Sequence, residues 1–109
     1  MAESTIKLNV ELDKNKVPEK IYWEASDMGE NKTQTNSFLL AVWENESKST
    51  LKIDLWTKEM LADDMKKFIH QTMVSISDTL RSSIGEEKAS KELEKFLVQF
   101  AKTLKISSQ

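Results

Sequence analysis

Thr50-Leu51-Lys52-Ile53-Asp54-Leu55-Trp56-Thr57-Lys58 is the stretch of sequence where a strand pattern changes into a helix pattern. Within it, Leu51, Ile53 and Leu55 alternate with polar residues, as a half-buried strand requires. Beyond it, apolar residues recur at helical spacing: Met65, Ile69, Met73, Ile76, Leu80 and Ile84. This junction therefore divides the chain into a β half and an α half.

Before the junction, the sequence predicts three further strands. Ile6, Leu8, Val10 and Leu12 alternate with polar residues, which predicts a strand over about residues 5–12. Two more strands are predicted over about 20–25 and 37–44, and the strand that contains the junction runs over about 50–56. Residues 26–36 are rich in Asp, Gly, Asn, Lys and Thr, which predicts the longest loop. Short connections elsewhere favour an antiparallel meander.

After the junction, the sequence predicts two amphipathic helices, over about 62–84 and 87–105. Asp63 and Asp64 fall in the first turn, where negative charge complements the helix dipole. Gly85 suits the left-handed position that ends many helices. The predicted fold is therefore α+β, a single domain over residues 1–109 in ββββαα order. Its four-stranded antiparallel sheet is expected to be packed on one face by the two C-terminal helices.

Composition excludes several classes of function. The chain has 109 residues, a net charge of −2, 31% charged residues and no cysteine. Mixed charges give no basic footprint for nucleic acid, and the lack of cysteine excludes disulfides and thiolate metal sites. No stretch approaches the roughly 20 apolar residues that span a bilayer, and the first residues lack a signal-peptide pattern. We therefore expect a cytoplasmic protein without membrane insertion or a nucleic-acid partner.

Residues with catalytic chemistry are scarce. His70 is the one histidine; a lone imidazole cannot build a structural zinc site, and a catalytic triad needs geometry that sequence does not supply. The two glycines stand outside any Gly-rich run, which excludes the recognised phosphate-binding motifs. We expect no enzyme, no cofactor, no metal and no small-molecule substrate. The alternative is an enzyme or ligand-binding domain around His70, which requires a pocket with converging polar groups.

The third predicted strand is apolar on both parities, which indicates that both sides of it are covered. Two helices can cover only one face of a sheet. The other face would then carry Leu39, Trp43 and Trp56, with Tyr22 as a further candidate, and we predict that it binds a partner or a second copy. In the alternative, the loop over 26–36 or the N-terminus folds over this face.

Four segments carry a family resemblance: Ile6-Lys7-Leu8-Asn9-Val10-Glu11-Leu12, Val17-Pro18-Glu19-Lys20-Ile21-Tyr22-Trp23-Glu24-Ala25, Leu51-Lys52-Ile53-Asp54-Leu55-Trp56-Thr57-Lys58 and Met65-Lys66-Lys67-Phe68-Ile69-His70-Gln71-Thr72. They are similar to the gliding-motility protein family GldC over nearly the whole chain. The chain departs from the family at Leu61, where a proline tends to open the helix. The resemblance implies a non-enzymatic accessory component of the gliding machinery of surface-crawling bacteria. It implies no site residues, and its partners would be other gliding-machinery proteins or a second copy.

The order of elements also favours an alternative function. Four antiparallel strands followed by two helices are similar to the order in SecB-type export chaperones, which hold unfolded clients. This is an analogy at the level of the fold. A holdase or secretion chaperone would need long exposed apolar surfaces and an oligomer, whereas an adaptor would need one defined patch.

Overall fold

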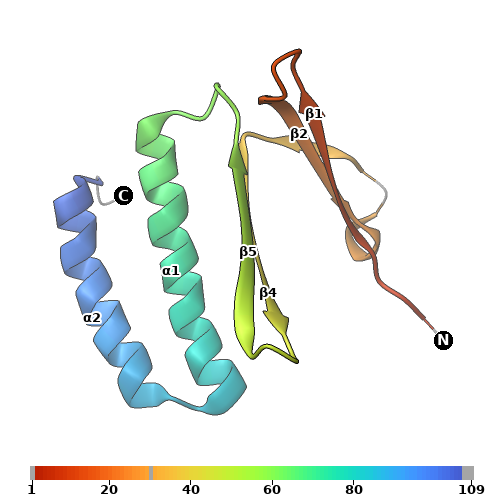
Figure 1. Ribbon diagram of the computed structural model, residues 1–109. Coiled ribbons are helices and arrows are strands. Elements are labelled where there is room, and N and C mark those ends of the chain that lie inside the picture. Colours follow the sequence, from red (N-terminus) through yellow and green to blue (C-terminus); the bar gives the residue numbers. More distant parts are fainter. Residues whose placement is uncertain (1, 30, 107–109) are drawn as a thin grey trace. The chain divides into compact units, whose positions relative to one another are not determined.

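The computed structural model describes residues 2–29 and 31–106. The chain divides into two units, Met1–Met60 and Leu61–Gln109. The first contains all the strands and the second contains both helices (Figure 1). The predicted α+β class with antiparallel strands and two C-terminal helices is confirmed. The predicted single domain over residues 1–109 stays a prediction.

A three-stranded antiparallel sheet opens the first unit. It contains β1 (Ile6–Leu12), β2 (Pro18–Ala25) and β3 (Thr33–Thr35), with β2 in the middle. Ile21 pairs with Val10 on one side and Thr35 on the other, and its side chain is fully buried. Strand pairing satisfies the backbone on both edges of this residue, but it does not by itself bury the side chain, since Tyr22 and Trp23 are paired on both sides and are only half-buried.

The turn between β1 and β2 is organised by one carboxylate. Asp13 Oδ1 accepts hydrogen bonds from the backbone N–H of Val17 at 3.0 Å and of Asn15 at 2.8 Å. These bonds, with a smaller contribution from Lys58, hold the pKa of Asp13 below its ordinary value of 3.8. Pro18 opens β2, a position where the missing backbone N–H is tolerated.

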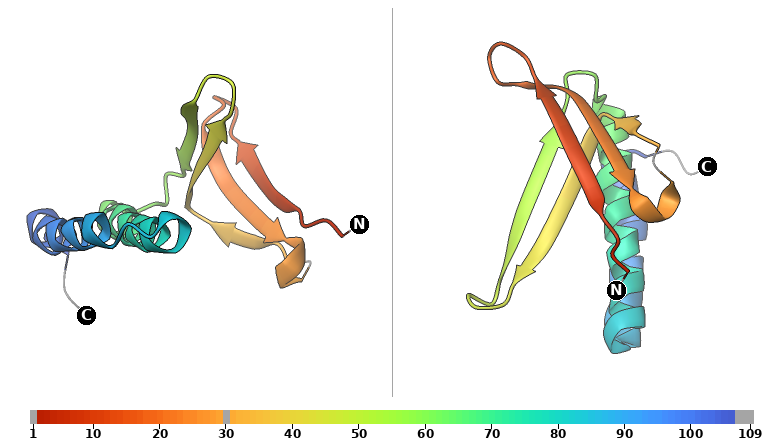
Figure 2. Two further views of the ribbon diagram at one scale, coloured as in Figure 1. Left: turned by 90° about the horizontal axis from the view of Figure 1, so that it is seen from below. Right: turned by 90° about the vertical axis from the view of Figure 1, so that its right-hand side faces the viewer.

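A separate two-stranded antiparallel sheet follows, formed by β4 (Ser37–Glu44) and β5 (Ser49–Trp56). Phe38 pairs with Leu55, Leu40 with Ile53, and Val42 with Leu51. The backbone N–H of Lys48 donates to Glu44 O at 3.0 Å to close the turn, and that of Thr57 donates to Asn36 O at 2.9 Å at the other end. Figure 2 shows this hairpin as a narrow ribbon, coloured yellow to green.

The predicted single four-stranded sheet is therefore wrong. The loop predicted over 26–36 contains a short 3₁₀ helix, Ser26–Met28, and the strand β3. Because β1 and β3 occupy both edges of β2, β4 has no free edge of β2 to pair with. β4 pairs with β5 alone, and the strands form one sheet of three and one of two. The other strand bounds lie within two residues of those predicted.

The second unit is a hairpin of two antiparallel helices, α1 (Ala62–Ile84) and α2 (Glu87–Leu104). Gly85 ends α1 in the left-handed conformation, with φ of 69°, and its backbone N–H bonds to Arg81 O. This confirms the predicted helix boundary. Near this end of the hairpin, Ser77 Oγ donates to Ser90 O at 3.0 Å, and both serines are buried. Small side chains there allow the two helices to approach closely.

Arg81 reinforces the contact between the helices. Its guanidinium donates to Glu94 on α2 and to Asp78 on α1. The bond to Glu94 raises the pKa of Arg81 above its ordinary value. Leu97, farther along α2, is the buried apolar residue of this unit. Within the described residues, Ile21 and Leu97 are the two apolar side chains that are buried.

Candidate functional site

The register of β4 and β5 sorts their side chains onto two faces, because successive residues of a strand point to opposite sides. One face, here called the tryptophan face, consists of Ser37, Leu39, Ala41, Trp43, Thr50, Lys52, Asp54 and Trp56. The other, here called the aliphatic face, consists mainly of Phe38, Leu40, Val42, Leu51, Ile53 and Leu55. The tryptophan face therefore carries three of the four side chains predicted to bind a partner.

The two tryptophans mark opposite ends of the tryptophan face. Trp43 pairs with Thr50 beside the turn, and Trp56 pairs with Ser37 at the other end. Each of these two tryptophan residues is 56% exposed, and Leu39 between them is also exposed. The described residues of the 26–36 loop and of the N-terminus therefore leave both tryptophans open to solvent, contrary to the alternative in which these segments cover the face.

One ion pair lies in the middle of the tryptophan face. Lys52 Nζ is 3.1 Å from Asp54 Oδ2, two residues along β5. Both side chains are about half exposed, so water screens the pair and its contribution to stability is small. Neither residue was predicted to belong to a binding surface, although their parity with Trp56 places them on the same face.

Tyr22 does not belong to this face. It lies on β2 in the three-stranded sheet, where it pairs with Asn9 and Gln34. Lys32 Nζ lies 4.8 Å from the centroid of the Tyr22 ring, within the range of a cation–π interaction. Tyr22 therefore has a local partner, and its strand belongs to a sheet that does not contain Trp43 or Trp56.

The aliphatic face also meets solvent. Val42, Leu51 and Ile53 each keep more than half of their surface exposed. Soluble proteins rarely expose large contiguous apolar patches, and a two-stranded ribbon alone is marginally stable in water. The hairpin is therefore a part of the chain that gains stability from additional contacts.

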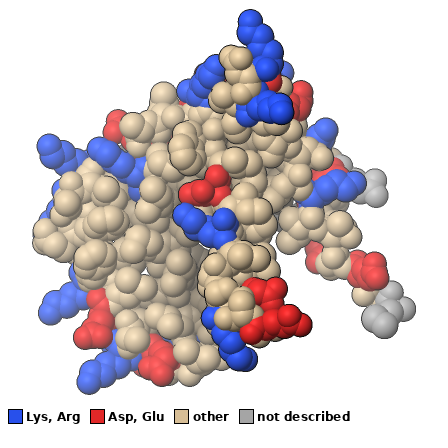
Figure 3. Space-filling model, in the orientation of Figure 1, with Lys and Arg blue, Asp and Glu red and all other residues tan. Residues whose placement is uncertain are grey.

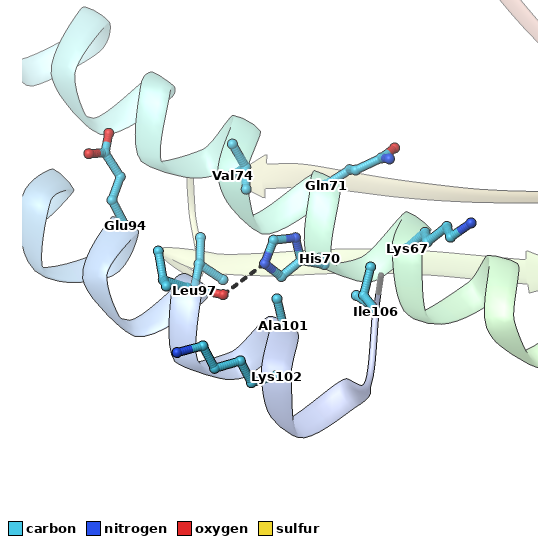
Figure 4. A pocket seen from close by; sticks show the side chains of 10 residues that line it. Lys67, His70, Gln71, Val74, Glu94, Leu97, Ala101, Lys102 and Ile106 are labelled. Carbon is cyan, nitrogen blue, oxygen red and sulfur yellow. Dashed lines mark hydrogen bonds between the residues drawn. The ribbon is translucent and has the colours of Figure 1, made fainter. Parts of the chain in front are cut away.

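The surroundings of His70 are structural in character (Figure 4). His70 Nε2 lies 2.9 Å from the backbone oxygen of Leu97, and because a carbonyl only accepts, Nε2 carries the proton. The open pocket around the ring is lined by four other polar residues, Lys67, Gln71, Glu94 and Lys102, and by several apolar residues. The side chains of these four polar residues extend away from the ring. The geometry joins α1 to α2 and offers His70 no side chain as a base partner.

Charged side chains of both signs are distributed over the described part of the chain. Across residues 2–29 and 31–106, no three His, Cys, Asp or Glu side chains gather where they could hold a metal ion. On the face seen in Figure 3, acidic and basic side chains are interspersed. In that same part of the chain, neither helix has the length and apolar character that a membrane span requires.

A family model described as gliding motility-associated protein GldC-like matches residues 18–106. The match begins at β2 and continues through both helices, so it includes the whole tryptophan face. It confirms the family resemblance found in the sequence. No curated protein and no solved structure shows significant similarity to the chain.

Proposed function

Because the chain belongs to the gliding motility-associated GldC-like family, we propose that it is a non-enzymatic accessory protein of the bacterial gliding machinery. It acts in the cytoplasm through protein–protein interaction. Its binding surface is the tryptophan face, and its partners are other proteins of the machinery or a second copy of the chain.

The exposure of Trp43 and Trp56 carries this proposal. Tryptophan is enriched at the energetic centres of protein interfaces, because its large ring buries much apolar area at a small cost in side-chain entropy. Both tryptophans are more than half exposed, and both lie on one face of the two-stranded ribbon. A surface of this kind is favourable to bury against another protein and unfavourable to leave in water.

The environment of His70 supports a non-enzymatic role. The proton on Nε2 is engaged by a backbone oxygen, and the nearby polar side chains do not converge on the ring. A general acid or base needs a reacting group within hydrogen-bond distance and a partner that orients it. The packing of two helices accounts for His70 without any reaction.

Capture of the tagged protein from gliding cells tests this proposal. Trp43→Ser and Trp56→Ser should each reduce recovery of the partner by more than tenfold, as loss of an aromatic anchor worth about 2 kcal/mol implies. Val98→Ser is the matched control, because Val98 is an exposed apolar residue of α2. Equal recovery with the tryptophan variants and the control would refute the tryptophan face as the binding surface.

The aliphatic face favours a second candidate function, that of a SecB-like holdase. Leu51, Ile53 and Val42 add exposed apolar surface on the side opposite the tryptophans, and client binding needs an extended surface of this kind. Aggregation of an unfolded protein, measured by light scattering with and without the purified chain, separates the two functions. Suppression at stoichiometric concentration supports the holdase, and unchanged aggregation supports the adaptor.

A further inference from the structure

Four cross-strand pairs follow one another along the tryptophan face. From the turn to the open end they are Trp43–Thr50, Ala41–Lys52, Leu39–Asp54 and Ser37–Trp56. The midpoint of this series lies at the level of the Leu40–Ile53 pair, whose side chains point to the aliphatic face. This order determines what each side chain meets when the face stacks on another copy of itself.

A twofold axis can lie between two stacked copies of this face, perpendicular to the strands, at the level of Leu40 and Ile53. Rotation about this axis reverses the order of the pairs and places each strand over the same strand of the second copy. Four kinds of opposition result, each occurring twice: Trp43 over Ser37, Trp56 over Thr50, Leu39 over Ala41, and Lys52 over Asp54. Every large side chain then faces a small one, and every charge faces its opposite.

A twofold axis that runs along the strands also stacks these faces, and it gives a poorer match. It places Leu39 over Asp54 and Ala41 over Lys52, so that four charges are buried against apolar side chains. In that arrangement each charge keeps its neighbour on its own strand but gains no opposite charge from the second copy, whereas opposed charges across an interface fix the register of the two chains. The arrangement of side chains therefore distinguishes between the two axes.

We propose that the tryptophan face is occupied by a second copy of the chain, related by the twofold axis perpendicular to the strands. This dimer rests on the proposed function, because the tryptophan face is taken as the binding surface. It identifies the partner as a second copy of the chain. A self-complementary patch is the requirement for a closed twofold dimer. The two sheets pack about 10 Å apart, a spacing that opposed large and small side chains fill.

In this dimer Lys52 of each copy lies opposite Asp54 of the other, and this contact depends most strictly on the position of the axis. Stacked sheets are rotated by about 30° because each sheet is twisted, and residues near the axis are displaced least by that rotation. Lys52 and Asp54 flank the level of the axis directly. In the dimer, each of these charges faces an opposite charge on the second copy as well as its neighbour 3.1 Å away on its own strand.

Charge reversal on separate chains tests the arrangement. Lys52→Glu places two acidic residues opposite each other in a homodimer, and Asp54→Lys places two lysines there. Each variant alone should therefore dimerise more than tenfold more weakly than the wild type in sedimentation velocity. An equimolar mixture should recover dimerisation, because the introduced glutamate of one chain meets the introduced lysine of the other, and the native Asp54 meets the native Lys52.

Recovery on mixing reports on contacts between chains alone. Within each variant chain, positions 52 and 54 carry like charges, and mixing leaves that intrachain repulsion unchanged. Lys95→Glu and Glu92→Lys on α2 are matched controls, since they change the net charge equally at exposed positions off the face. Both controls should dimerise like the wild type.

The wild-type chain supplies a readout that is independent of the folding of any variant. Trp43 and Trp56 lose water on dimerisation, so their fluorescence should shift to longer wavelength when the protein is diluted. Trp23 lies in the three-stranded sheet and contributes a constant background. A Trp23→Phe chain isolates the signal of the two tryptophans on the face.

The possible results test three claims separately: the direction of the axis, the second copy as the partner, and the proposed function. Weak dimerisation of both variants, with no recovery on mixing, overturns the perpendicular axis, as does unchanged dimerisation of either variant. A wild-type chain that stays monomeric, with constant fluorescence, while Trp43→Ser loses capture of another protein, overturns the second copy as the partner and leaves the proposed function intact. Dimerisation and capture that are both insensitive to Trp43→Ser refute the proposed function itself.

Discussion

The two sheets of the first unit use apolar residues in opposite ways. In the three-stranded sheet, Ile21 lies on the central strand and is fully buried by its own chain. In the β4–β5 hairpin, Trp43 and Ile53 point to opposite faces, and each is more than half exposed. The difference indicates that the first sheet is completed within one chain, whereas the hairpin carries more apolar surface than its own sheet can bury.

Ile21→Ala should produce the largest loss of stability. The side chain is fully buried, so truncation removes its transfer free energy and leaves a cavity, at a cost of about 2–5 kcal/mol. Ile53→Ala, at a position 53% exposed, should cost far less in the dilute monomer. Denaturant unfolding of both variants measures this difference, and equal losses would remove the contrast between the two sheets.

Trp43→Ser and Trp56→Ser should have the next largest effect, and on association alone. Each should weaken self-association or partner binding by more than tenfold, equivalent to about 1.4 kcal/mol or more. The unfolding of the dilute monomer should change little, because both rings are exposed. Circular dichroism beside sedimentation separates the two effects; a variant that unfolds would show that the tryptophans are core residues.

His70→Ala should have a smaller effect, confined to stability. It removes the hydrogen bond from Nε2 to the Leu97 oxygen, which is worth about 0.5–1.5 kcal/mol. His70→Gln retains a side-chain donor and should be closer to the wild type. Gliding of cells that carry either folded variant should be nearly unchanged. Loss of gliding in folded His70→Gln would overturn the non-enzymatic proposal.

Asp13 should give the smallest effect, seen as acid sensitivity of the first unit. Its pKa in the folded protein is below 3.8 because the N–H groups of Val17 and Asn15 bond to the carboxylate. The stabilisation is therefore present above about that pH and is lost as the pH falls through the lower, folded-state value. Thermal unfolding across this range should show a shallower acid dependence for Asp13→Asn than for the wild type. An unchanged dependence would contradict the assignment.

Local hydrophobic periodicity predicted most helices and strands of the fold, but it did not predict which strands pair with one another. The periodicity in β1, β4, β5, α1 and α2 is local, so their bounds could be predicted within two residues. β3 was missed because it has three residues, all polar, inside a segment with loop composition. The division into two sheets depends on which strand pairs with β2, a long-range choice that no local periodicity records.

The prediction of the candidate site was likewise correct where local pattern was sufficient and wrong where it depended on strand pairing. Leu39, Trp43 and Trp56 were assigned to one face correctly, because alternation along a strand and the short β4–β5 turn determine parity. Tyr22 was grouped with them on the assumption of a single sheet, and the observed strand order places it elsewhere. Lys52 and Asp54 share the parity of Trp56, so a register drawn from the turn could have identified them.

Sedimentation velocity of the wild-type chain and of Trp43→Ser, each from nanomolar to high micromolar concentration, tests the role of the tryptophan face most directly. We expect the wild type to pass from monomer to dimer over this range, and the folded variant to stay monomeric to more than tenfold higher concentration. Identical sedimentation of the two proteins, as dimers at every concentration, would contradict it, because another surface would then hold the copies together.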